Sequence, residues 1–169
     1  MPIVTTDIQI RLSGGAANSN VNASLGGAKS STQVTDNTLN NLFDDVSGSE
    51  SLAGDTEYRC VYIHNAHASL TMQNVRVYVQ SNTSSTNDTW EIGLGTAALN
   101  ATEQTIADET TAPSGVTFSA PTSYATGLAP PDIPFGQHKA IWYKRIVDPS
   151  AAANNNDTIT INIDCDTAA

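Results

Sequence analysis

The residues of this sequence that could carry chemistry are few, and their spacing matches no common catalytic arrangement. His64 and His67 form an H-x-x-H pair, but residues three apart on a β-strand point to opposite faces, so the pair is a poor metal site. His138 has no cysteine or histidine near it in the sequence. No G-x-S-x-G elbow and no phosphate-binding P-loop occurs. We therefore expect no enzymatic activity, no bound metal and no cofactor.

Carboxylates are plentiful, as in the adjacent Asp44 and Asp45, and such groups serve glycosidases and calcium sites. A glycosidase needs two carboxylates at a set separation around the scissile bond. Only 6% of residues are aromatic, and Trp90 and Trp142 lie in strand-like alternation that is typical of a core. No EF-hand pattern is present. Loop solvation explains the acidic residues, and calcium or glycan binding stays an open alternative.

Basic residues gather in one short stretch that contains Lys139, Lys144 and Arg145. Two interpretations stay open. The stretch is an edge strand that lysine protects from unwanted pairing, or it is a basic spot that docks on an acidic neighbour. In the second case these three residues are candidate interaction residues.

Period-two alternation of apolar residues predicts the strands that must position these groups. The segment 56–65 is apolar on both faces, which predicts a central strand, and the last two strands are expected to pair as a hairpin. One short helix is expected within 36–48, because apolar residues there have helical spacing and Gly48 can end it. The predicted strands are 7–12, 56–65, 74–81, 89–95, 138–147 and 158–165.

This pattern predicts an all-β fold, namely a single β-sandwich or jelly-roll domain over residues 1–169 with long loops and at most one short helix. The length of 169 residues suits one domain. Cys60 and Cys165 both fall in predicted strands. The sequence does not establish a disulfide between them, and we expect buried free thiols.

The net charge is −10, with a pI near 4.3. Such a chain repels phosphate backbones, so we expect no nucleic-acid partner. The N-terminal segment lacks the pattern of a signal peptide, and no apolar run is long enough to span a membrane. We therefore expect synthesis in the host cytoplasm and no membrane contact.

Three blocks of sequence carry a resemblance to a known group of proteins. They are LSGGAANSNVNASLGGAKSS, NNLFDDVSGSESLAGDTEYRCVYIHN and IPFGQHKAIWYKRIV, which together run from Leu12 to Val147. The chain resembles small structural proteins of tailed bacteriophages, and among these it is most similar to capsid decoration, or cement, proteins. The resemblance implies a homotrimer or dimer that binds the major capsid protein at capsomer junctions on the virion surface and stabilises the shell. A tail, baseplate or head-fibre component and a carbohydrate- or receptor-binding module are the alternatives.

The glycine-rich segment 12–35 offers little apolar surface to bury. Gly14, Gly15, Gly26 and Gly27 are separated mainly by small polar residues, and ordering such a chain costs much conformational entropy. We expect either an extended arm that neighbouring subunits or the capsid order, or an ordinary loop. In an arm, the four glycines are candidate contact residues.

Overall fold

Alternating apolar residues form the strands of this computed structural model, which describes residues 2–83, 85–154 and 157–167. The predicted all-β fold is confirmed, and each of the six predicted strands is present within two residues of its expected ends. The largest differences are that β4 begins two residues earlier and that β8 lies two residues nearer the C-terminus. The strands are β1 (Ile8–Leu12), β2 (Gly26–Gly27), β3 (Asp55–Asn65), β4 (Met72–Ser81), β5 (Asp88–Leu94), β6 (Glu103–Thr105), β7 (His138–Val147) and β8 (Thr160–Thr167).

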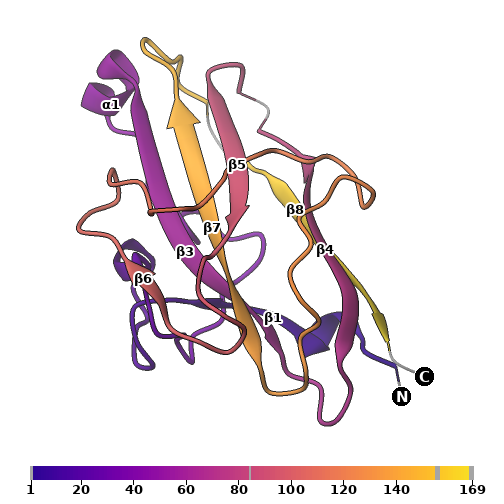
Figure 1. The fold of residues 1–169 in the computed structure, drawn as a ribbon. Helices are drawn as coiled ribbons and strands as arrows, with labels where there is room; N and C mark the ends of the chain where they lie inside the picture. Colours follow the sequence, from indigo (N-terminus) through magenta and orange to yellow (C-terminus); the bar gives the residue numbers. More distant parts are fainter. Residues whose placement is uncertain (1, 84, 155–156, 168–169) are drawn as a thin grey trace.

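The strands form three antiparallel sheets. The largest has the order β1-β3-β7-β5, and β4 pairs with β8 in a second layer. The short strands β2 and β6 pair over the other face of the large sheet (Figure 1). No strand in these sheets pairs with its neighbour in sequence, so the chain crosses between layers in the manner of a β-sandwich.

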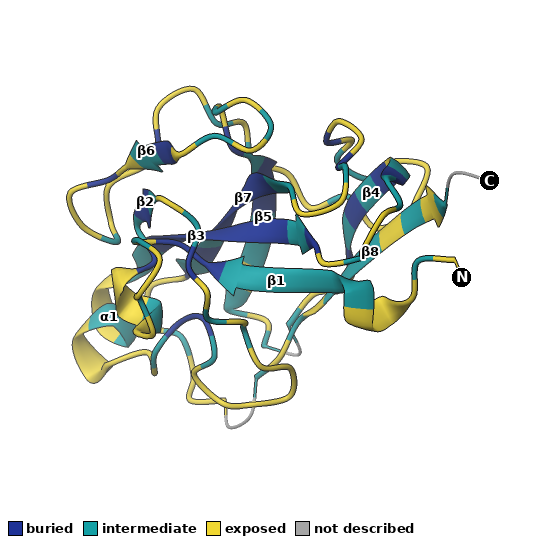
Figure 2. Cartoon of the chain, turned by 90° about the horizontal axis from the view of Figure 1, so that it is seen from below, coloured by how far each residue is buried: buried dark blue, intermediate teal, exposed yellow. Residues whose placement is uncertain are grey.

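Both faces of the large sheet are covered, which explains why β3 is apolar on both faces. One face of β3 carries Val61 and Ile63, which pack with β4 and β7 in the main core. The other face carries Cys60 and Tyr62, which pack with Trp142 in a second core under β2, β6 and the nearby loops. Figure 2 shows β3 and β7 almost entirely buried at the centre. Within the described residues, no helix is long and apolar enough to cross a membrane.

The expected hairpin between the last two strong strands is wrong. β7 lies between β3 and β5, with Cys60 opposite Trp142, and β8 pairs with β4. The physical reason is burial. β7 is apolar on both faces and needs a strand on each side and a layer above and below, whereas β8 is apolar on one face only.

The expected helix within 36–48 is also wrong, because the helix α1 (Gly48–Ala53) begins where that helix was expected to end. Asn37 and Asn40 have a φ of 55°, which interrupts a right-handed helix. Ser47 accepts a hydrogen bond from the backbone N–H of Glu50, and the Glu50 carboxylate accepts one from the backbone N–H of Ser47. This capping box, readable as S-x-x-E, starts α1.

Residues 12–35 form a folded loop and not an extended arm. The backbone N–H of Leu12 donates to the carbonyl of Thr32, and that of Val34 donates to Ile10. The same loop covers the end of β3 that β1 does not reach, because Cys60 donates its N–H to the carbonyl of Ser24. Backbone hydrogen bonds to the rest of the chain therefore offset the entropic cost of ordering this segment.

Candidate functional site

A groove of about 1140 Å³ opens between the large sheet, β8 and the segment 36–48. It exists because the second layer has two strands and cannot cover the inner face of a four-stranded sheet. Apolar and polar side chains line it in about equal measure, and the apolar ones gather over the large sheet and β8. These are Ile10, Val61 and Tyr143 from the large sheet, Ile161 and Ile163 from β8, and Leu42 and Phe43 from the covering segment.

One end of the groove is charged. Arg145 donates from Nε to Glu57, at 2.6 Å, and from Nη1 to the carbonyl of Asp44. Two guanidinium groups lie against the ring of Phe43, that of Arg59 at 5.2 Å and that of Arg145 at 4.9 Å from its centre. Glu57 and Arg145 lie at paired positions on β3 and β7. Arg145 also lies 3.9 Å from the Asp44 carboxylate, so it fastens the covering segment to the sheet.

Three carboxylates meet at this end, where oxygens of Asp44, Glu57 and Glu109 lie within 4.8 Å of one another. Such a set could hold a hard cation. However, Arg59 is paired with Glu109 and Arg145 with Glu57. The two arginines already supply positive charge where a metal ion would bind, so the geometry fits an ion-pair cluster better than a metal centre.

Asp88, at the start of β5, is a titratable group of the groove whose pKa departs clearly from its ordinary value. Burial raises its pKa to about 6, with the Asp157 carboxylate also raising it and Arg145 opposing the shift. Its Oδ1 atom is buried without a hydrogen-bond partner. Asp88 can therefore gain or lose a proton near neutral pH, which makes it a pH-sensitive group in the wall of the groove.

The edges of the strands differ in how they are covered. The loop at 30–34 bonds to the outer edge of β1, and Ser119 exchanges both backbone hydrogen bonds with Ile92 on β5. The segment 121–133 bonds along the outer edge of β4. Within the described residues, the backbone groups of β8 bond to β4 alone, and Ile3 donates its backbone N–H to the hydroxyl of Thr167 at the C-terminal end of β8. β8 is therefore the open edge of the sandwich.

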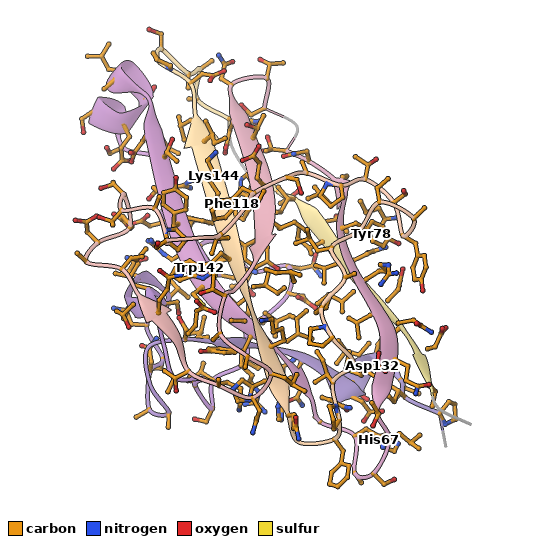
Figure 3. The ribbon with its side chains drawn as sticks, in the orientation of Figure 1. His67, Tyr78, Phe118, Asp132, Trp142 and Lys144 are labelled. Atoms are coloured by element: carbon orange, nitrogen blue, oxygen red, sulfur yellow. The ribbon has the colours of Figure 1, made fainter. Side chains whose placement is uncertain are left out.

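The sequence-predicted basic residues do not form a surface patch. Lys139 is buried and donates to the carbonyls of Gly95 and Ala97, and Arg145 is buried in the ion-pair cluster. Lys144 pairs with Glu91, and its Nζ lies 5.9 Å from the centre of the Phe118 ring. The labelled side chains of Lys144 and Phe118 lie close together in Figure 3. The edge-strand interpretation is wrong, since β7 is an inner strand. Lys139 and Arg145 are not accessible for docking, and docking through Lys144 stays a prediction.

Two of the four glycines are required by contacts inside the chain. A Cβ atom on Gly26 would lie 1.8 Å from the carbonyl oxygen of Gln104, and one on Gly14 would lie 2.5 Å from that of Ala23. Gly27 accepts a hydrogen bond from the hydroxyl of Tyr62. Gly15 has open space around it, and its role as a contact residue stays a prediction.

The histidines show what the sequence alone missed. His138 does have a histidine partner, because the pairing of β3 with β7 places it opposite His64. Burial lowers the pKa of His138 to about 4, with Lys29 and His64 lowering it further. His67 lies in the loop at the lower end of the molecule in Figure 3, where its Nδ1 accepts hydrogen bonds from the backbone N–H groups of Ser69 and Leu70. A turn-forming role for His67 follows from these bonds.

Comparison with known proteins gives no relative. No family model, no curated protein and no solved structure matches this chain.

Proposed function

We propose that the protein is a non-enzymatic structural protein of a virus particle, which binds the outside of the head as a decoration protein and stabilises the shell. The observation that carries this proposal is the open edge of β8 beside a groove that is apolar along β8 and the large sheet. An unpaired edge beside an apolar groove favours assembly with another chain. The sequence resemblance to phage decoration proteins supplies the virion setting.

The use of charge in the groove supports a structural role. Arginine side chains pair with Glu57 and Glu109 inside the fold, so these carboxylates fasten segments together. The surface is also suited to packing, because only 14% of the residues are charged. A decoration protein adds contacts at capsomer junctions that must break before the shell opens, and many copies multiply this effect.

The copy number in purified particles tests the proposal. Quantitative mass spectrometry would measure the ratio of this protein to the major capsid protein in particles that contain it. A simple ratio near one or one third supports decoration of the whole head. A ratio that corresponds to a vertex or a tail would replace decoration by a tail, baseplate or head-fibre role, and absence from particles would refute a virion role.

Self-association is a separate expectation of the same proposal. Light scattering on the purified chain distinguishes a trimer or a dimer from a monomer, and the proposal expects an oligomer. A strictly monomeric protein that also fails to bind bare heads would contradict it.

A further inference from the structure

We infer that the open edge of β8 receives an extended segment of a partner protein in which apolar residues alternate with lysine or arginine. The segment would add a third strand to the two-stranded layer and fill the groove. The inference rests on the backbone, the groove and the charges of β8, and it does not depend on a virion setting.

The backbone of β8 presents a regular row of groups that have no backbone partner among residues 2–83, 85–154 and 157–167. Val77 on β4 exchanges both backbone hydrogen bonds with Leu128, and Val79 donates to Pro121, so both residues point away from β8. In an antiparallel pair their partners point away as well. Those partners are Ile163 and Ile161. The N–H and C=O groups of Ile161, Ile163 and, by alternation, Cys165 therefore face outward along the open edge.

The groove supplies the place for a third strand. The side chains of Ile161, Ile163 and Cys165 point into the sandwich and are only partly buried against the main core. A strand paired with β8 would lie over the inner face of the large sheet, where the partly exposed Ile10 lines the groove. Every second side chain of the added strand would then lie beside Ile161, Ile163 and Cys165 on this inner face, and those residues should be apolar.

The other side chains of the added strand would lie beside acidic groups. Asp164 and Asp166 are exposed on the outer face of β8, where they accept hydrogen bonds from the Tyr78 hydroxyl and the Asn74 amide. Neighbouring side chains on one face of a sheet are about 5 Å apart, and opposite charges there are favourable. Lysine or arginine at these positions therefore complements β8.

The same charges argue against a second copy of this chain as the occupant. Pairing of β8 with another β8 would bring aspartates together, which is unfavourable. The chain has seven lysine and arginine residues. In the described part of the chain, the strands that carry basic residues have no free edge to offer to β8 of another copy. β7 is paired with a strand on each of its edges, and β1, the strand of Arg11, is bridged to Gln33 on its outer edge.

A peptide-binding experiment tests the inference. The probe is the capped, fluorescein-labelled peptide Lys-Val-Lys-Ile-Lys-Val-Lys, and the control is Lys-Lys-Val-Ile-Val-Lys-Lys, which has the same composition and charge. Fluorescence anisotropy at about 150 mM salt limits non-specific attraction to the acidic protein. We expect the alternating peptide to bind at least about tenfold more tightly. Equal affinities would overturn the inference.

Two variants separate the backbone from the side chain. Ile163→Pro removes one outward N–H, a change that an open edge tolerates because no bond to β4 is lost. Ile163→Ala keeps the N–H and loses similar side-chain volume. The alternating peptide should bind Ile163→Pro at least about tenfold more weakly than Ile163→Ala. Equal binding to both variants would overturn the inference.

Hydrogen exchange on the unaltered protein gives a result that does not depend on the folding of a variant. The amides of Ile161, Ile163 and Cys165 should exchange fast in the free protein and become protected by the alternating peptide. The amides of Asn162 and Asp164, which face β4, should be protected in both states. Binding without this alternation, or no gain of protection at the open edge, would overturn the inference.

Discussion

The ion pair between Glu57 and Arg145 holds the charged end of the groove, and its removal has a calculable effect. The two side chains are 2% and 7% exposed. Arg145→Met removes one partner and leaves the Glu57 carboxylate buried without its main compensating charge. Breaking a buried pair in this way costs about 3–5 kcal/mol of unfolding free energy.

The double variant Glu57→Leu with Arg145→Met is the matched control. Replacing a whole buried pair by apolar residues of similar volume is close to neutral. The variant also loses the contact of Arg145 with Phe43, which is worth about 1 kcal/mol. We therefore expect the double variant to be less stable than the wild type by about 1–2 kcal/mol and clearly more stable than Arg145→Met alone.

The loss of stability caused by Arg145→Met should depend on pH, because the ionisation of Glu57 causes it. Burial raises the pKa of Glu57, and Arg145 opposes the shift. Without Arg145 the folded-state pKa rises further above the unfolded value, so the penalty is absent at low pH and appears as the pH rises through the unfolded pKa. Arg145→Met should therefore lose less stability at about pH 4 than at about pH 7, by roughly 1 kcal/mol or more.

Urea unfolding followed by tryptophan fluorescence at both pH values measures these free energies. Trp142 is fully buried, so its emission should report unfolding. The reasoning would be refuted if the double variant were as unstable as Arg145→Met, or if the cost of Arg145→Met were the same at both pH values. Either result would mean that packing, and not the uncompensated charge, sets the cost.

Three further predictions concern other parts of the chain. Gly26→Ala should lower the free energy of unfolding by about 2 kcal/mol more than Gly15→Ala. Both glycines have a positive φ, but of the two only Gly26 would bring a Cβ atom against backbone. Thermal melts compare the two variants, and equal losses of stability would count against the close contact at Gly26. Asp88→Asn should stabilise the protein by about 1 kcal/mol at pH 7, after allowance for partial exposure, because the raised pKa of Asp88 makes its charged form unfavourable in the folded state. This gain in stability should vanish as the pH falls through about 6 toward 4, where the carboxyl of the unaltered protein becomes protonated. Urea titrations across this pH range test the prediction, and a gain that is independent of pH would refute it. Iodoacetamide should modify Cys165 in the native protein and Cys60 only in urea, because both thiols are free but only Cys60 is fully buried. Intact-mass spectrometry counts the modified thiols. Modification of Cys60 in the native protein would contradict the fold.

Much of the site could not be predicted from the sequence, because it depends on strands that pair although they are far apart in the sequence. The capping box at Ser47 and Glu50 was a local signal that could have placed α1 correctly. The partnership of His64 with His138 had no local signal, because it follows from the register of β3 against β7. The burial of Lys139 and Arg145 had none either, since a lysine or arginine is ordinarily expected at the surface.

The sequence by itself determined the strands and the all-β class, because alternation of apolar residues is a property of each segment. It also indicated that β3 is central, because that strand is apolar on both faces. Tertiary structure alone decided that β8 joins β4 rather than β7, that the glycine-rich segment folds back on β3, and that the outer edge of β8 is open within the described part of the chain. Strand order depends on which faces are left to be covered once the other layers have packed, and no single segment of sequence contains that information.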